Sequence, residues 1–165
     1  MIFLGVDIGS TGCKCVAFSD AGTQLSSAYR EYPQKAGSTD LDADVLRESA
    51  LSVIAECVAG LDDARDVAAV AFSSFGESFV PLDERGEPMW PIIMFFADRG
   101  AAELKRCVEA VGAEKIMRIT RTMPDTMYSL PKISYVSAKL KKRVWKYMQM
   151  TDYLVYTLSG EAVME

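Results

Sequence analysis

The hydrophobic pattern at the start of the chain predicts three consecutive β-strands. The expected strands cover residues 2–7, 13–19 and 23–32, and a turn at 20–22 joins the last two. Connections this short are typical of hairpins, so we expect the sheet to begin with antiparallel strands.

A helix is expected next, after a polar connection over residues 33–40. Asp42 is a suitable N-cap, and Gly60 marks the C-terminal end. Between them, apolar residues recur at helical spacing, namely Leu46, Ala50, Val53, Ile54 and Cys57.

A continuous apolar run over residues 67–73 predicts a buried parallel strand. Residues 79–82 and 88–96 predict a further strand pair around the turn at 83–86.

The rest of the chain has helical patterning. Helices are expected over 99–111, near 113–119, from Ser129 onward and over 151–158. Strands followed by helices, around a β-β-β-α-β core, indicate an α/β domain with a mixed sheet flanked by helices.

Composition limits the classes of function. A length of 165 residues suits one domain with a core of its own. The net charge of −5 argues against nucleic acid as a partner, because phosphate backbones require a basic face. One basic cluster alternates with apolar residues and is interpreted as the solvated side of helices; it comprises Lys139, Lys141, Lys142, Arg143 and Lys146.

Histidine is absent, which excludes Ser-His-Asp triads, Cys-His pairs and His-ligated metals. The four cysteines, Cys13, Cys15, Cys57 and Cys107, lack the C-x-x-C spacing and fall on apolar positions, so we expect buried free thiols. No signal peptide opens the chain and no apolar stretch is long enough to cross a bilayer. A cytoplasmic protein without a membrane partner is therefore expected.

The turn between the first two strands is the main candidate for chemistry. Asp7 ends the first strand, and Gly9, Ser10, Thr11 and Gly12 precede the strand that carries Lys14. Glycines permit backbone angles that side chains forbid, and successive amides in such a turn can converge on an anion. A carboxylate beside bound phosphate suits a hydrated Mg²⁺. The alternative is an ordinary hairpin with a glycine turn.

Five segments, in this order and spacing, resemble the amino-terminal portion of the FGGY carbohydrate kinases. They are 5–14 (GVDIGSTGCK), 72–83 (FSSFGESFVPLD), 93–99 (IMFFADR), 130–133 (LPKI) and 152–160 (DYLVYTLSG). The first motif recurs in other ATPases, and the five together are specific.

The resemblance implies a ribonuclease-H-like fold of the actin and hexokinase type. It also implies ATP-dependent phosphorylation of a sugar or polyol hydroxyl by a two-domain enzyme. Residues 1–165 then form the amino-terminal part of the first domain. The catalytic base is expected beyond Glu165, so the isolated piece should be inactive and prone to self-association, including homo-oligomers.

The resemblance also implies roles for residues of the turn. Asp7 matches the carboxylate that holds Mg²⁺ through water, and Lys14 matches a basic residue that faces the nucleotide. Gly9, Ser10, Thr11 and Gly12 match the turn that contacts the phosphates of ATP.

For the substrate, the resemblance points to Gly76, Glu77, Phe95 and Asp98. Gly76 stands where glycerol kinases have an Arg, which leaves room for a larger substrate. The family's Trp-x-Asp-x-Arg becomes Phe95-Phe-Ala97-Asp98-Arg99, so Ala97 occupies the Asp position. Met127 stands near the position where glycerol kinases have a Tyr that contacts glycerol. Glycerol is therefore not expected as the substrate.

Two other classes of function remain open at this stage. One is a non-kinase actin-like ATPase, such as an activator that holds an iron–sulfur cluster through cysteines. The other is a binding domain without activity.

Overall fold

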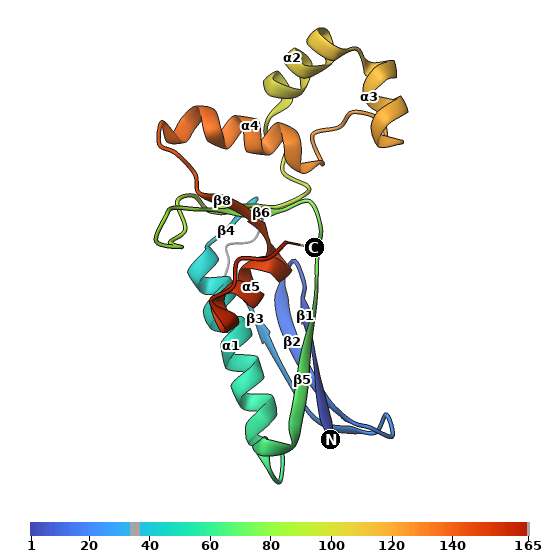
Figure 1. The fold of residues 1–165 in the computed structure, drawn as a ribbon, viewed down its shortest axis with the longest axis vertical. Coiled ribbons are helices and arrows are strands. Elements are labelled where there is room, and N and C mark those ends of the chain that lie inside the picture. Colours follow the sequence, from blue (N-terminus) through green and yellow to red (C-terminus); the bar gives the residue numbers. More distant parts are fainter. Residues whose placement is uncertain (34–36, 165) are drawn as a thin grey trace.

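The structure, a computed structural model, describes residues 1–33 and 37–164. A four-stranded sheet with one long helix forms one end of the molecule, and three shorter helices form the other end (Figure 1). Residues 34–36 of the predicted polar connection lie outside the described residues.

The main sheet has the strand order β3-β2-β1-β5. Its strands are β1 (Ile2–Ile8), β2 (Gly12–Ser19), β3 (Gln24–Glu31) and β5 (Val67–Ser74). The first three pair antiparallel, whereas β5 runs parallel to β1. Both the three hairpin strands and the parallel direction of β5 agree with the sequence prediction.

Helix α1 (Ala43–Ala59) covers one face of this sheet. The Asp42 carboxylate accepts hydrogen bonds from the backbone N–H groups of Asp44 and Val45, which confirms the predicted N-cap. Because one sheet face packs against the helix, the residues of β1 are alternately buried and exposed. The opposite face of the sheet is open, and Asp7 and Lys14 lie on it.

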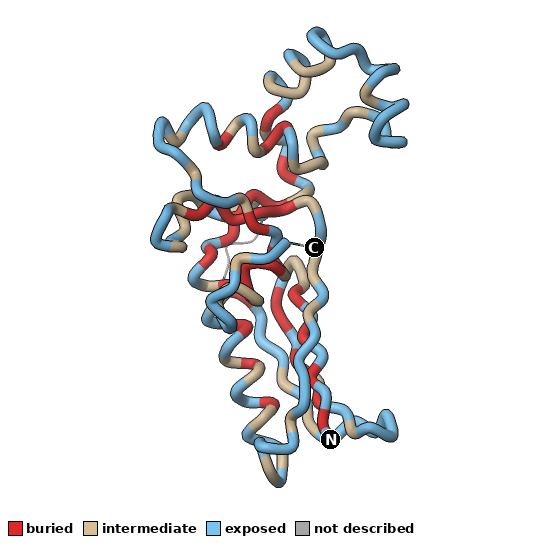
Figure 2. Tube along the Cα trace, viewed as in Figure 1, coloured by how far each residue is buried: buried red, intermediate tan, exposed pale blue. Residues whose placement is uncertain are grey.

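The burial predicted for β5 is wrong. This strand lies at the edge of the sheet, and most of its side chains are exposed (Figure 2). The apolar composition of a run indicates that a strand is suited to burial. Burial itself requires other segments to pack against the strand, and most of the β5 side chains have no such segment over them.

Two short strand pairs lie between the sheet and the three helices. Strand β6 (Phe79–Leu82) pairs with β8 (Lys146–Gln149), and β4 (Asp40–Leu41) pairs with β7 (Ile92–Ile93). The predicted pairing of 79–82 with 88–96 is therefore only partly right, because a single bridge joins Leu82 to Pro88. Hydrophobicity marked β6 and the region of β7, but it gave no sign of β4 or β8 and did not specify partners so distant in the sequence.

The helices of the second half are α2 (Ala101–Val111), α3 (Ala113–Thr120), α4 (Ser129–Leu140) and α5 (Met150–Ser159). A short 3-10 helix, η1 (Ala64–Asp66), precedes β5. All four predicted helices are present. The basic cluster was assigned wholly to helices, which is wrong, because α4 ends at Leu140 and Lys146 begins β8. Its five cations are nevertheless exposed.

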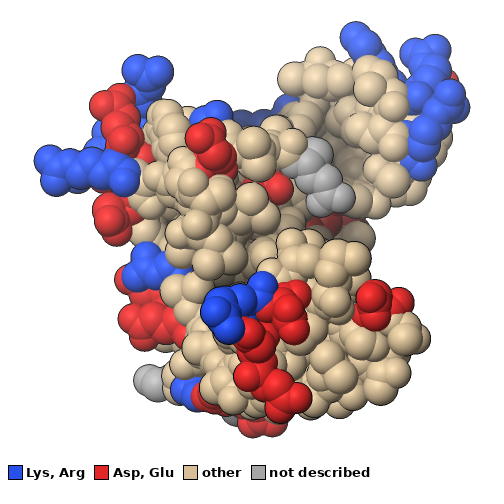
Figure 3. All heavy atoms as spheres, turned by 60° about the horizontal axis from the view of Figure 1, so that its bottom comes forward, with Lys and Arg blue, Asp and Glu red and all other residues tan. Residues whose placement is uncertain are grey.

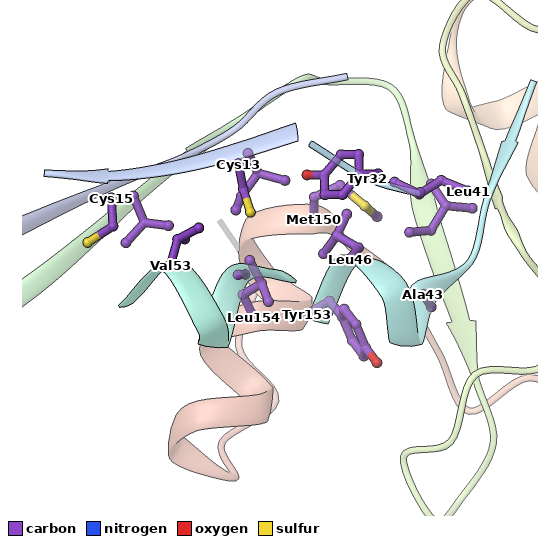
Figure 4. Packing of buried hydrophobic residues seen from close by; sticks show 14 of the residues in the cluster. Cys13, Cys15, Tyr32, Leu41, Ala43, Leu46, Val53, Met150, Tyr153 and Leu154 are labelled. Atoms are coloured by element: carbon purple, nitrogen blue, oxygen red, sulfur yellow. The ribbon is translucent and has the colours of Figure 1, made fainter. Parts of the chain in front are cut away.

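The main core lies between β2, α1 and α5, whose apolar side chains point toward one another (Figure 4). Cys13, Cys15 and Cys57 are buried there as free thiols, whereas Cys107 is only half-buried, contrary to the prediction. Burial raises the pKa of Cys13 to about 11. It also raises the pKa of Cys15 to about 12, with a smaller contribution from the neighbouring Cys57. Among the described residues, no helix combines the length and the apolar character that crossing a bilayer requires.

Candidate functional site

The turn between β1 and β2 is held by backbone hydrogen bonds at both of its ends. The N–H of Gly9 donates to the carbonyl oxygen of Gly12 at 2.9 Å, and the N–H of Tyr32 donates to that of Thr11 at 3.0 Å. Ser10 is half-buried and Thr11 is exposed. The turn is therefore fixed from β3 while its hydroxyl groups remain accessible.

Gly12 is needed for a reason other than the one expected. Neither Gly9 nor Gly12 has a positive φ. A Cβ atom on Gly12 would lie 2.4 Å from the carbonyl oxygen of Arg30 and 2.9 Å from the Cα of Glu31. Close approach of β3, rather than an unusual backbone angle, thus excludes a side chain at this position.

Replacing Gly12 by Ala should destabilise the protein, since the clashing atoms belong to backbone that can move only by opening the sheet. We expect a loss of about 1–3 kcal/mol in the free energy of unfolding, measured by denaturant titration. Gly5→Ala is the matched control, because a Cβ there would meet nothing within 4 Å. Equal unfolding midpoints for the two variants would contradict this account.

A row of polar side chains crosses the open face of the sheet beside this turn. In the strand register, Asp7 lies opposite Lys14 on one side and Ser73 on the other, and Lys14 lies opposite Tyr29. The Ser73 hydroxyl donates to Asp7 Oδ1 at 2.6 Å, which leaves Oδ2 of that carboxylate available. Asp7, Lys14 and Ser73 border a hollow of about 340 Å³, the sheet hollow, whose other walls are mainly apolar and include Val16 and Phe18.

The donor set of the sheet hollow fits a hydrated magnesium ion. Mg²⁺ keeps most of its waters and needs only one or two carboxylates, and Asp7 supplies one. The described residues contain no group of three or more His, Cys, Asp or Glu side chains that could enclose a metal directly. A hydrated ion shared with phosphate oxygens is thus the arrangement that these residues suit.

Gly76 and Glu77 leave the sheet at the edge where the β1–β2 turn lies. The N–H of Phe75 donates to the carbonyl oxygen of Ile8 at 3.2 Å, which extends the pairing of β1 and β5 by one step. Parallel strands end at the same edge, where ligands of α/β sheets usually bind. The structure therefore brings the two predicted groups to one edge, although they are far apart in the sequence.

The Glu77 side chain caps the N-terminal end of helix α4. Its Oε2 atom accepts hydrogen bonds from the backbone N–H of Ser129 at 2.7 Å and from the Ser129 hydroxyl at 2.9 Å. Within the described residues, no hydrogen bond occupies Oε1. Gly76 beside it is exposed, and a Cβ there would meet nothing within 4 Å, in agreement with the expected open space.

Phe95 and Asp98 belong to the segment that leads into α2. Phe95 is half-buried with its ring edge-on to Phe96, and Asp98 is exposed. Ala97 is buried in a small core with Phe79, Ile93 and Val136, so the position that carries Asp in the family motif faces inward here. Of the two candidates, only Asp98 has an accessible side chain.

Backbone packing brings this segment to the start of α4. Arg99 pairs with Asp40 at 2.8 Å, which ties the segment to β4. A Cβ on Gly100 would lie 2.5 Å from the carbonyl oxygen of Pro131, so the chain passes directly against the first turn of α4. Within the described residues, no hydrogen bond joins Phe95 or Asp98 to Glu77.

Glu77 also borders a second hollow, the helix hollow, which lies between α2, α3 and α4. It has a volume of about 510 Å³, and its walls include Leu104, Ile116, Met123 and Tyr128. The sheet hollow is bordered by Asp7 and Lys14, which flank the turn, and Glu77 is not part of its lining. Sequence analysis assigned no role to Ser73, Ser129 or Lys132, because each acts through a partner distant in the chain.

Comparison with known proteins identifies relatives along the whole chain. The family model described as "FGGY family of carbohydrate kinases, N-terminal domain" matches residues 2–165. A xylulose kinase from Staphylococcus xylosus is 24% identical over 168 residues, covering 98% of this chain and 35% of the relative. A gluconokinase from Bacillus subtilis is also 24% identical over 168 residues, covering 98% and 33% respectively.

Solved structures show the same fold. A xylulose kinase from Rhodospirillum rubrum superposes with a TM-score of 0.90 at 19% identity, covering 99% of this chain and 35% of that one. The expected fold class, a ribonuclease-H-like domain of the actin and hexokinase type, is confirmed by such neighbours. The chain spans about a third of the length of the curated relatives that it matches.

Proposed function

Since the chain belongs to the FGGY family of carbohydrate kinases, we propose that it is the amino-terminal part of the first domain of such an enzyme. The whole protein would transfer a phosphoryl group from ATP to a hydroxyl of a sugar or polyol. One observation carries the proposal. The Phe75–Ile8 hydrogen bond extends the pairing of β1 and β5 to the sheet edge that holds both the β1–β2 turn, proposed to bind phosphate, and the Glu77 carboxylate, proposed to bind hydroxyl groups.

In this proposal the β1–β2 turn binds the phosphates of ATP. The hydroxyls of Ser10 and Thr11 and the Lys14 ammonium are the donors, while Gly9 and Gly12, joined by the bond from the Gly9 N–H to the Gly12 carbonyl oxygen, shape the turn. Asp7, held by Ser73, would bind Mg²⁺ through water. A bound magnesium ion would offset the negative charge of the transferring phosphoryl group, where most of the catalysis of phosphoryl transfer arises.

The substrate would lie against Gly76 and Glu77. The free Oε1 atom of Glu77 can accept hydrogen bonds from sugar hydroxyls, and orienting the attacking hydroxyl is a large part of what a kinase contributes. Phe95 and Asp98 would complete this side of the site. The open space beside Gly76 favours a substrate larger than glycerol. The catalytic base would come from the chain beyond Glu165.

Further properties of the whole protein follow as proposals. We expect a cytoplasmic enzyme, because three buried free thiols suit a reducing compartment. The net charge of −5 argues against nucleic acid as a partner, and on the face drawn in Figure 3 the basic side chains lie in several separate groups, some of them beside acidic ones. The exposed edge of β5 favours self-association of residues 1–165 when they are isolated.

The alternative functions receive less support. An activator that holds an iron–sulfur cluster needs accessible cysteines, and Cys13, Cys15 and Cys57 lie in the core. A binding domain without activity remains the expectation only for residues 1–165 in isolation.

The test is an assay of the full-length protein with ATP, Mg²⁺ and a panel of ketoses, aldoses and polyols. We expect ADP to form only when a suitable sugar is present, together with a phosphorylated sugar detected by mass spectrometry. Residues 1–165 alone should give no turnover. ATP hydrolysis without transfer, or no reaction with any sugar, would overturn the proposed function.

A further inference from the structure

Lys132 is a buried cation that has no role in the proposed chemistry. It lies in the first turns of α4, and its exposed fraction is 0%. A positive charge there is unfavourable twice, because burial removes its hydration and the helix N-terminus carries a partial positive charge. Burial lowers the pKa of its ammonium, while the Glu77 and Asp125 carboxylates act in the opposite direction.

The ammonium bonds to the backbone rather than to a carboxylate. Nζ donates to the carbonyl oxygen of Glu77 at 3.2 Å and, in a shorter contact, to the carbonyl oxygen of Met127. One side chain thus joins three segments: the connection that follows β5, the loop before α4 and α4 itself.

Glu77 needs such support because its backbone is unusual. Its φ of 58° places it in the left-handed region, which a residue with a side chain rarely adopts. Conformations of this kind persist where the surroundings fix them, often at ligand sites. Two sets of hydrogen bonds fix the left-handed conformation of Glu77. Lys132 donates to its carbonyl oxygen, and Ser129 donates to its carboxylate.

We propose that Lys132 is a positioning residue that holds Glu77 in its left-handed conformation, so that the free Oε1 atom faces the sugar. The inference rests on the proposed function of Glu77 as a substrate ligand. Lys132 itself touches no substrate; its two hydrogen bonds place the residue that does.

The test compares Lys132→Met with Lys132→Gln in the full-length enzyme. Met keeps the volume of the side chain without donors, whereas Gln keeps N–H donors without the charge. Lys132→Met should raise the KM for the sugar by roughly tenfold and leave the KM for ATP unchanged. Lys132→Gln should raise the KM for the sugar less than Lys132→Met does, because its amide, although one bond shorter than the lysine side chain, keeps N–H donors directed toward the same carbonyls.

A double-mutant cycle separates positioning from general damage. In a Glu77→Ala background, Lys132→Met should raise the sugar KM no further, because the residue through which Lys132 acts has lost its carboxylate. An equal rise in both backgrounds, an equal rise for ATP, or equal effects of Met and Gln would each overturn the inference.

Failure of the proposed function would look different, since the wild type itself would then phosphorylate no sugar. In that case a crystal structure of full-length Lys132→Met tests whether Lys132 positions Glu77. We expect residue 77 to leave the left-handed region and its carboxylate to leave Ser129. An unchanged Glu77 in that variant would overturn the positioning role.

Discussion

Replacing Asp7 by Asn in the full-length enzyme should lower kcat by about a hundredfold to a thousandfold, the range seen when one preorganised electrostatic contact is removed. Asn keeps the shape of the side chain and can still accept the hydrogen bond from Ser73. It removes the negative charge that would attract a hydrated Mg²⁺. The concentration of Mg²⁺ that gives half-maximal activity should therefore rise as well.

A direct binding measurement separates this effect from loss of the fold. Mn²⁺ binding in the presence of ATP, followed by electron paramagnetic resonance, should weaken in Asp7→Asn while the thermal unfolding midpoint changes little. Asp20→Asn is the matched control, because Asp20 lies exposed at the far end of the same hairpin. Normal Mn²⁺ affinity and normal kcat in Asp7→Asn would remove Asp7 from the metal site.

The second large effect is expected for Glu77→Ala, which should raise the KM for the sugar by roughly tenfold to a hundredfold. Hydrogen bonds to a charged group typically contribute about 1.5–3 kcal/mol, and Oε1 is the oxygen left free for them. The KM for ATP should stay unchanged, because Asp7 and Lys14 border the sheet hollow whereas Glu77 borders the helix hollow.

Loss of the Ser129 contacts should also cost this variant about 1 kcal/mol of stability, as for other helix caps. Glu77→Gln keeps an acceptor for Ser129, so it should recover that stability but only part of the sugar affinity. Glu84→Ala, at an exposed position of the 83–86 turn, controls for loss of an acid elsewhere. A rise in the KM for ATP rather than for the sugar would show that Glu77 does not bind the substrate.

Most of the fold could be predicted because its signals are local. The strands of the β1–β2–β3 meander, the Asp42 cap of α1 and the helices of the second half follow from patterns within short windows of sequence. The errors concern pairing between distant segments. β7 pairs with β4 rather than with β6, and β8 was missed, because a two- to four-residue strand has too few positions to show a period.

The residues of the candidate site also fall into those that local sequence indicated and those that only long-range contacts revealed. The turn from Asp7 to Lys14 is contiguous, so the sequence alone indicated its residues. Ser73 and Ser129 could not be found like this, since each matters only through a carboxylate far away in the chain. The Phe95 and Asp98 side chains were named from the family pattern, and packing shows that Ala97 rather than Asp98 faces the core.

By itself the sequence indicated the family, the β1–β2–β3 meander, the helices and the glycine-rich turn, because hydrophobic period, caps and glycine spacing act over a few residues. Only the tertiary structure decided that Gly12 is required by the approach of β3, that β5 is an exposed edge, and that Lys132 and Ser129 hold Glu77. These facts depend on contacts between segments tens of residues apart, whose distances are set by the packing of the whole chain.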